Sequence, residues 1–282
     1  MVTIRVPATT ANIGPGYDSQ GMALNLYNTF TFEKKDVEVD ERNLIYRSFK
    51  YLYEKNNLKA PYVEIKVSTE IPMSRGLGSS ASCIIAGLMA ANEMSGLKLD
   101  KKEILKYATD IEGHPDNVAP ALFGGHITSI VNKQVYYSRK EVNNNYKLYV
   151  LVPDFELRTV EAREVVKKEV KLEDAVSNIA RATLISDALY NGDFELLKGA
   201  AEDKLHEPYR KNLINDYDYF KKICENNNAV LFISGAGPSL LVITTKDNSS
   251  ISTVLKESNN SEFNWKVYEL EVDIEGATII NN

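Results

Sequence analysis

Residues 72–82 read PMSRGLGSSAS, and this glycine- and serine-rich stretch lies directly before the most regular helical pattern of the chain, Ser79–Met94. Five apolar side chains recur on one face of that pattern: Ala81, Ile84, Ile85, Leu88 and Met89. Gly96 follows where a C-terminal helix cap belongs. A helix that begins after such a loop exposes unpaired N–H groups and the positive end of its dipole. The stretch therefore predicts an anion site, with an ordinary glycine turn capped by serines as the alternative.

Two familiar phosphate-binding patterns do not fit this loop. A Walker A loop needs Gly-Lys-Ser/Thr, which is absent here. Gly76, Gly78 and Ala81 satisfy the dinucleotide pattern G-x-G-x-x-A, which also needs an acidic residue at the end of a second strand about 20 positions later. Asp100 stands at that distance but opens the next predicted helix, so the dinucleotide interpretation is rejected.

Around this loop, strands and helices mix without strict alternation, which predicts an α+β fold rather than a doubly wound parallel sheet. Seven segments predict strands: Val2–Val6, Leu24–Phe32, Tyr62–Val67, Gly124–Val131, Tyr146–Val152, Ala229–Ser234 and Leu240–Thr245. Five further segments predict helices: Leu44–Glu54, Leu99–Ile111, Ser177–Tyr190, Phe194–Lys204 and Leu213–Asn226. The pattern changes near residue 150, so we expect two domains, 1–150 and 151–282.

Composition excludes several classes of protein. Thirty-three Lys and Arg against 39 Asp and Glu give a formal net charge of −6, which predicts neither a nucleic-acid partner nor an anionic membrane partner. No stretch approaches the ~20 uninterrupted apolar residues of a membrane span, and the first residues lack a signal-peptide pattern. Two cysteines, Cys83 and Cys224, do not make a disulfide framework and predict reduced thiols in a cytoplasmic protein.

Three further segments carry glycines or chemically active side chains. Ala8–Gln20 reads ATTANIGPGYDSQ, Ser234–Ser239 reads SGAGPS, and Glu112–Asn117 reads EGHPDN. Either of the two loops alone would be read as a turn. Three glycine loops together with Glu112–Asn117 are harder to interpret as ordinary turns, and they strengthen the case for phosphate binding.

These motifs resemble those of the GHMP small-molecule kinases. The resemblance rests on PATTANIGPGYD, on P-x-x-x-G-L-G-S-S-A and on SGAGPS, and it runs from about residue 3 to about residue 245. EGHPDNVAPALFGG and HEPYR match best the branch of the family that acts on L-homoserine. The resemblance implies ATP-dependent phosphorylation of the side-chain hydroxyl of L-homoserine for threonine biosynthesis. The implied fold is an N-terminal ATP-binding domain similar to the second domain of ribosomal protein S5, followed by a ferredoxin-like C-terminal domain that completes the substrate site.

For the nucleotide, the resemblance implies that residues 72–82 hold the ATP phosphates, with backbone N–H groups of Gly76 to Ser80 donating. The expected residues are Pro72, Met73, Ser74, Arg75, Gly76, Leu77, Gly78, Ser79, Ser80, Ala81 and Ser82. Ser80 and Glu112 match the family's magnesium-associated hydroxyl and carboxylate, and Mg²⁺ needs only one or two protein ligands beside its waters. Asn43 is expected near the adenine.

For homoserine, the resemblance implies a pocket with carboxylates for the ammonium and arginines for the carboxylate. The matched residues are Asn12, Asp18, His114, Asp116, Thr159, Arg163, Arg210 and Gly235. Asn117 occupies the position at which mevalonate kinases carry an aspartate, which is read as their catalytic base. An amide takes no proton at neutral pH, so this position predicts catalysis by positioning and charge neutralisation.

Other interpretations remain open at this stage. The histidines show no zinc-ligand spacing, because position 210 is arginine where H-E-x-x-H needs histidine, and His126 is expected to be structural. A GHMP kinase for another small alcohol, a non-catalytic sensor and a nicotinamide-dependent oxidoreductase are the alternatives. A carboxylate-bearing substrate explains Arg163 and Arg210 better than a sugar does. The sequence leaves a homodimer open.

Overall fold

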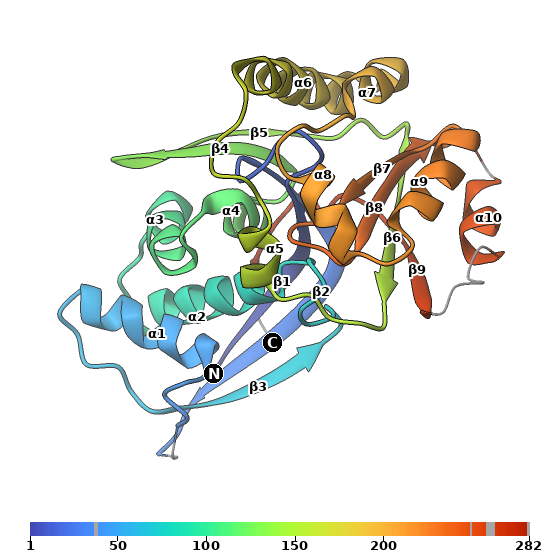
Figure 1. The fold of residues 1–282 in the computed structure, drawn as a ribbon. Coiled ribbons are helices and arrows are strands. Elements are labelled where there is room, and N and C mark those ends of the chain that lie inside the picture. The colour runs from blue at the N-terminus through green and yellow to red at the C-terminus, as the bar shows by residue number, and fades with distance from the viewer. Residues whose placement is uncertain (37–38, 249, 258–262, 281–282) are drawn as a thin grey trace.

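The computed structural model describes residues 1–36, 39–248, 250–257 and 263–280, and it contains two antiparallel sheets (Figure 1). The first sheet has the order β10-β1-β2-β4-β5, with β3 also paired to β2. Its strands are β1 (Val2–Ala11), β2 (Gln20–Lys34), β3 (Val63–Thr69), β4 (His126–Asn132), β5 (Gln134–Lys140) and β10 (Thr278–Ile280). The second sheet has the order β7-β8-β6-β9. Its strands are β6 (Tyr146–Pro153), β7 (Val230–Ile233), β8 (Leu240–Thr245) and β9 (Trp265–Leu270).

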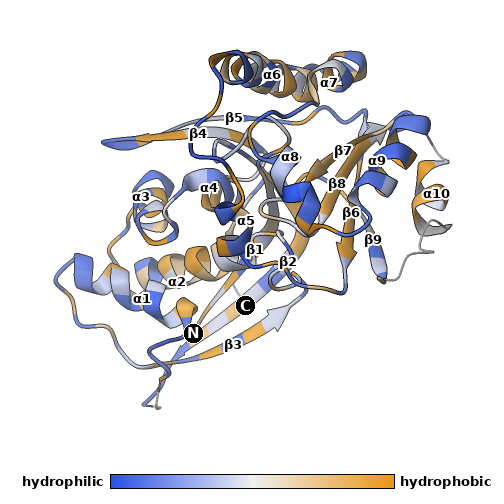
Figure 2. Ribbon diagram, viewed as in Figure 1, coloured by the Kyte–Doolittle hydropathy of each residue, from blue (hydrophilic) through white to orange (hydrophobic). Residues whose placement is uncertain are grey.

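The helices pack against these sheets in groups. In Figure 1, four helices gather beside the first sheet: α1 (Leu44–Lys55), α2 (Ser79–Ser95), α3 (Lys101–Glu112) and α4 (Pro115–Phe123). The remaining helices are α5 (Thr159–Glu164), α6 (Leu172–Asn191), α7 (Phe194–Ala200), α8 (Glu207–Arg210), α9 (Tyr217–Asn226) and α10 (Ile251–Glu257). Figure 2 shows hydrophobic strands β7 and β8 behind the more hydrophilic helices α8 and α9. Among the described residues, none of the helices combines the length and apolar character that a membrane crossing needs.

The α+β class is confirmed, and the sheets are mixed with helices as expected. The division at residue 150 stays a prediction. β6 and later strands form the second sheet, but β10 returns to pair with β1. One hydrophobic cluster also joins the two sheets, since Met22 and Leu24 of β2 pack with Val150 of β6 and Leu241 of β8.

β1 is longer than predicted, because Pro7 does not end it. The pairing of β1 with β2 shifts register between Pro7 and Ala8, where Pro7 faces Tyr27 and Ala8 faces Leu24. A bulge tolerates a proline, which lacks the N–H that a regular ladder requires. The strand therefore continues to Ala11 and carries Thr9 and Thr10 into the interior, and the loop before β2 is shorter than Ala8–Gln20.

α4 was not predicted, because two prolines made its sequence resemble a loop. Pro115 occupies the first turn, where a helix needs no N–H donor. Pro120 lies inside the helix and cannot donate to the carbonyl of Asp116. Gly21 of β2 lies against that same carbonyl, and a Cβ at Gly21 would lie 1.8 Å from Asp116 O. Glycine at position 21 thus allows β2 to approach the distorted helix closely.

Other boundaries differ where local patterns were weak. α6 begins earlier than Ser177, α7 ends at Ala200 rather than at Lys204, and α9 begins at Tyr217 rather than at Leu213. Six further elements were not predicted from the sequence: β5, α5, α8, α10, β9 and β10. Most of these are short, and β5 is largely exposed, so neither apolar periodicity nor length distinguished them from loops.

Candidate functional site

The three glycine loops and the Glu112–Asn117 segment meet around one cavity of about 350 Å³. Its lining includes these predicted residues: Asn12, Asp18, Pro72 to Ser80, Glu112, His114, Asp116, Asn117, Thr159, Arg163, Arg210 and Gly235. They come from the loop after β1, the start of α2, the α3–α4 turn, α5, α8 and the β7–β8 loop. Segments more than 200 residues apart in the sequence therefore share one cavity.

The start of α2 gives the cavity one electropositive wall. Ser74, Gly76 and Gly78 have φ values of 53°, 71° and 67°, so the loop before the helix is tightly wound. Gly78 is the N-cap and supplies no side-chain bond to the first-turn N–H groups. These donors and the helix dipole favour an anion at the start of α2.

The two glycines of this loop are needed for contacts within the protein. A Cβ at Gly76 would lie 2.2 Å from Ser234 O, and a Cβ at Gly78 would lie 1.9 Å from Thr9 Oγ1. We expected both positions to lack side chains so that a phosphate could approach. The structure gives another reason, because the missing side chains would collide with the β7–β8 loop and with β1.

Ser80 and Glu112 bring two hard oxygen donors together beside the phosphate loop. The Ser80 hydroxyl donates to Glu112 Oε2 over 3.1 Å. Burial raises the pKa of Glu112, and the nearby His114 partly offsets this. A partly buried carboxylate next to a hydroxyl, beside an anion-binding loop, fits Mg²⁺, which prefers oxygen ligands.

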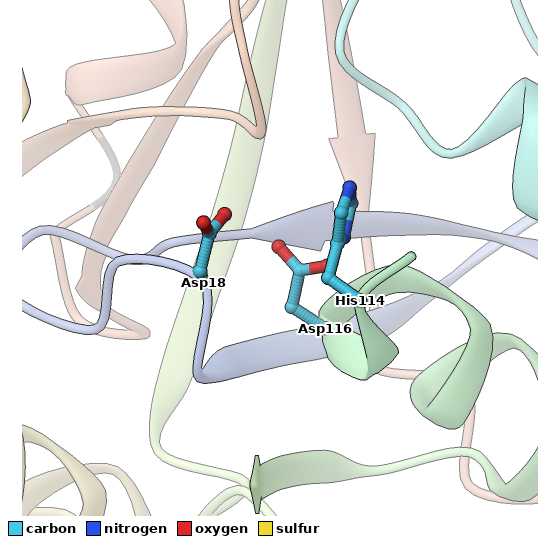
Figure 3. A group of neighbouring side chains, drawn as sticks. All are labelled: Asp18, His114 and Asp116. Atoms are coloured by element: carbon cyan, nitrogen blue, oxygen red, sulfur yellow. The ribbon is translucent and has the colours of Figure 1, made fainter. Parts of the chain in front are cut away.

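Asp18, His114 and Asp116 form the acidic part of the cavity (Figure 3). Their ligand atoms lie within 4.8 Å of one another, and Asp18 comes from the loop after β1 while the other two begin α4. His114 Nδ1 is hydrogen-bonded to Asp116 Oδ1. Burial disfavours the imidazolium of His114, but the bond to Asp116 outweighs burial and raises its pKa. The cluster presents negative charge to a bound cation or ammonium group.

Arg163 of α5 lies next to this acidic part of the cavity. It donates through Nη1 and Nη2 to the two carboxylate oxygens of Asp18, over 3.0 and 2.9 Å. Burial alone would lower the pKa of Arg163, but the bonds to Asp18 raise it. Both side chains are about one-third exposed, 37% for Arg163 and 33% for Asp18, so each stays accessible to a ligand from the cavity.

Arg210 of α8 is held more deeply than Arg163. It is 1% exposed, donates from Nε to Ala162 O over 2.9 Å and from Nη1 to Gly235 O over 3.1 Å. Its guanidinium lies 4.9 Å from the ring centre of Tyr17. Burial lowers its pKa, yet an arginine remains charged at neutral pH. Arg210 therefore contributes a fixed positive charge and also connects α5 to the β7–β8 loop.

Asn12 is engaged with the protein rather than free. Its Nδ2 donates to Gly235 O over 2.5 Å, and its Oδ1 accepts from the Asp18 N–H over 2.9 Å. Asn12 thus shapes the loop that presents Asp18.

Thr159 is exposed at the rim, and Asn117 Oδ1 accepts a hydrogen bond from Thr9 over 2.7 Å.

Three predicted nucleotide contacts do not line the cavity. Ala81 and Ser82 face the interior, where the Ser82 hydroxyl donates to Ser79 O. Asn43 caps α1 by accepting from the Ile45 N–H, while its neighbour Leu44 lines the cavity. Three lining residues were not predicted from the sequence: Leu44, Cys83 and Ala236. Cys83 lies four residues after Ser79, on the same face of α2, and this spacing could have predicted it as a lining residue.

His126 and His206 are buried, and among the described residues neither belongs to a group of side chains that could hold a metal ion. Burial lowers the pKa of each to about 4, so both are neutral at pH 7. His206 Nε2 donates to Gly14 O over 2.8 Å, which links α8 to the loop after β1. His126 lies 3.3 Å from Gln20 Oε1, in agreement with its expected structural role.

Comparison with known proteins identifies relatives over the whole chain. Residues 43–125 match the family of GHMP kinases, N-terminal domain. The homoserine kinase of Clostridium botulinum (strain Langeland) is 43% identical, covering 100% of this chain and 99% of the relative. The homoserine kinase of Clostridium beijerinckii is 41% identical, with 99% of each chain covered. The crystal structure of homoserine kinase from Cytophaga hutchinsonii superposes with a TM-score of 0.87 at 26% identity, covering 99% of this chain and 97% of that one.

Proposed function

Because this chain belongs to the homoserine kinases of the GHMP kinase family, we propose that it transfers the γ-phosphoryl group of ATP to the side-chain hydroxyl of L-homoserine. The observation that carries the proposal is the cavity itself. One wall is a helix N-terminus suited to phosphates, and the other pairs carboxylates with arginines. Such a cavity suits a zwitterionic amino acid placed in line with a nucleotide phosphate. The product is O-phospho-L-homoserine, an intermediate of threonine biosynthesis.

The nucleotide half of the site consists of residues 72–80, which include Ser80, and of Glu112. N–H groups at the start of α2 donate to the phosphates of ATP. Ser80 and Glu112 would hold Mg²⁺, which neutralises charge that shifts between phosphate oxygens during transfer. A cation beside Glu112 also offsets the burial that raises the pKa of this carboxyl group.

The amino-acid half separates the two charges of homoserine. Asp18 and Asp116 receive the ammonium group, and Arg163 and Arg210 receive the carboxylate. Thr159 and Gly235 also line the cavity, and His114 holds Asp116 in place through its hydrogen bond. A substrate without both charges would leave part of this polar lining unpaired, which is costly in a partly buried site.

The transfer step needs no strong base. The hydroxyl oxygen of homoserine forms a bond to the γ phosphorus while the bond from that phosphorus to the β–γ bridging oxygen breaks. The hydroxyl proton passes to a phosphoryl oxygen of the product or to water. Asn117, which lines the cavity, positions the hydroxyl rather than removing its proton, since an amide does not ionise.

An ADP-release assay with a panel of acceptors tests this function. We expect ATP and Mg²⁺ to support turnover with L-homoserine and not with mevalonate, galactose or shikimate, and phosphorus NMR to identify O-phospho-L-homoserine. Turnover with mevalonate or galactose but none with homoserine would contradict the substrate. No turnover with any acceptor, despite binding of ATP and homoserine, would favour a sensor.

We further propose a cytoplasmic protein that acts on small molecules without nucleic acid, in keeping with its net charge of −6. A homodimer is supported by α6, where Leu172, Val176 and Ile179 are 78%, 57% and 70% exposed on one helical face. Sedimentation velocity at micromolar concentration tests the dimer.

A further inference from the structure

Thr9 connects three parts of the site at one point. It is fully buried in β1, and its backbone N–H donates to Leu77 O of the phosphate loop over 3.2 Å. Its hydroxyl donates to Asn117 Oδ1 over 2.7 Å, although the two residues are 108 positions apart in the sequence. Thr9 therefore touches the phosphate loop through its backbone and the start of α4 through its side chain.

Gly78 leaves the room in which this hydrogen bond forms. A Cβ at Gly78 would lie 1.9 Å from Thr9 Oγ1 and 3.3 Å from Asn117 Oδ1. The first residue after the loop, Ser79, begins α2 at this place. The hydroxyl of Thr9, the amide of Asn117 and the start of α2 are thus packed together, and Gly78 and Asn117 line the cavity.

In the structure, the Thr9 hydroxyl occupies the carbonyl end of the Asn117 amide and leaves the nitrogen end for a ligand. A side-chain amide offers a carbonyl oxygen on one side and two N–H donors on the other, and the two orientations are nearly equal in shape. A hydroxyl that donates to Oδ1 occupies the carbonyl side. Because Asn117 lines the cavity, Nδ2 is then the group left to meet a substrate there.

We propose that Thr9 is a positioning residue that locks the Asn117 amide with its N–H donors toward the acceptor hydroxyl. This inference rests on the proposed function. Nδ2 then donates to the hydroxyl oxygen of homoserine, one lone pair of which stays directed at the γ phosphorus. The hydroxyl proton points away from Asn117, toward the phosphoryl oxygens that receive it. A fixed amide also needs no reorientation during each turnover. The hydrogen bond from Thr9 therefore raises kcat.

Replacement of Thr9 by valine tests the hydroxyl without changing the shape of the side chain. We expect kcat of Thr9→Val to fall about tenfold, the equivalent of one hydrogen bond of roughly 1.4 kcal/mol in the transition state. KM for homoserine and for ATP should change less than about twofold, because ground-state binding does not need the locked amide. Thr9→Ser keeps the hydroxyl and should recover most of kcat. If Thr9→Val does not fold, the smaller Thr9→Ala takes its place.

Two comparisons distinguish positioning from packing. Thr3 of the same strand bonds Thr31 through its hydroxyl over 3.2 Å, outside the cavity lining, so Thr3→Val is a matched control that should leave kcat unchanged. In a double-mutant cycle with Asn117→Ala, Thr9→Val should cause almost no further loss. Unchanged kcat in Thr9→Val, or losses that simply add in the cycle, would overturn the proposal.

A spectroscopic measurement separates this inference from the proposed function. The side-chain ¹H–¹⁵N signals of Asn117, assigned by their loss in Asn117→Ala, should shift in Thr9→Val and stay in place in Thr9→Ser. If these signals respond as expected but homoserine is no substrate, the proposed function is wrong and the positioning role of Thr9 is supported. If homoserine is phosphorylated while neither the signals nor kcat respond to Thr9→Val, only the positioning role of Thr9 is wrong.

Discussion

Glu207 places a carboxyl group in the interior three residues before Arg210. It is 5% exposed, its Oε1 accepts from the Ile233 N–H over 2.8 Å, and its Oε2 accepts from the Tyr217 hydroxyl over 3.3 Å. Burial raises the pKa of Glu207 to about 7, against partial opposition from Lys221 and the bond from Ile233. At neutral pH the protein thus holds a carboxyl group that ionises more easily when the chain is unfolded.

The titration of Glu207 predicts a pH-dependent free energy of unfolding. Its pKa is about 7 when folded and near 4.5 when unfolded, so its contribution is fully present below pH 4.5 and is lost as pH rises to about 7. Glu207→Gln mimics the neutral form at every pH. We expect the unfolding free energy of the parent, relative to Glu207→Gln, to fall by up to about 3 kcal/mol across this window. Urea denaturation of both proteins from pH 4.5 to 7.5 measures it, and a difference independent of pH would contradict the prediction.

At the scale of single residues, the sequence could predict most side chains of the site but not their partners. Ser80 and Glu112 were matched by motif, and the Ser80 hydroxyl donates to Glu112 Oε2 over 3.1 Å. Thr9 could not be singled out, because β1 contains several threonines of equal strand propensity and only the fold brings one to Asn117. The pairing of Asp18 with Arg163 depends in the same way on contacts that no local pattern contains.

At the scale of elements, the two ends of α2 offer a comparison between strain and steric conflict. Gly78 before the helix and Gly96 after it have left-handed backbones, with φ of 67° and 73°. A Cβ at Gly78 would collide with Thr9, whereas a Cβ at Gly96 would meet nothing within 4 Å. The left-handed conformation costs an alanine about 1–2 kcal/mol at either end, and only Gly78 adds a clash.

We therefore expect Gly96→Ala to lower the unfolding free energy by about 1 kcal/mol without any effect on ATP binding. Gly78→Ala should cost a further 1–3 kcal/mol, on the order of other overpacked sites, and should weaken ATP binding because the phosphate loop must shift. Denaturant unfolding and calorimetric titration with ATP measure both quantities. Equal behaviour of the two variants would show that Gly78 serves only its backbone conformation.

The predictability of an element followed the strength of its local signal. α2 was predicted well because Gly78 and Gly96 bound an apolar run with helical spacing. α4 was missed because Pro115 and Pro120 favour a loop locally, while tertiary packing against Gly21 stabilises the helix. β9 and β10 gave no usable pattern, since their pairing with β6 and β1 is non-local.

At the scale of the whole molecule, the amino-acid half of the site bridges the two sheets. Asp18 belongs to the loop that connects β1 and β2 of the first sheet, while Arg163 and Arg210 follow β6 in the chain. Arg210 bonds two backbone carbonyls in the interior, so its removal would leave Ala162 O and Gly235 O without this donor. Arg163 bonds only the Asp18 carboxylate, which is about one-third exposed, and it is therefore the cleaner residue with which to test the substrate.

Arg163→Met keeps the aliphatic bulk and removes the charged fork. If Arg163 binds the carboxylate of homoserine, KM for homoserine should rise about 10- to 150-fold, the loss of a charge-assisted bond of roughly 1.5–3 kcal/mol. KM for ATP should change little, because Arg163 bonds Asp18 and makes no hydrogen bond to the phosphate loop. Arg158→Met, at a 75% exposed arginine just before α5, is the matched control and should leave both KM values unchanged.

A substrate lacking the carboxylate completes this test. Homoserine methyl ester should be much poorer than homoserine for the parent protein, but only slightly poorer for Arg163→Met, because the variant has already lost the partner of that charge. If the KM values for ATP and for homoserine instead rise together, the bond from Arg163 to Asp18 serves to hold the two sheets in position. In that case the carboxylate would need another partner, and the choice of homoserine over uncharged alcohols would lose its main physical support.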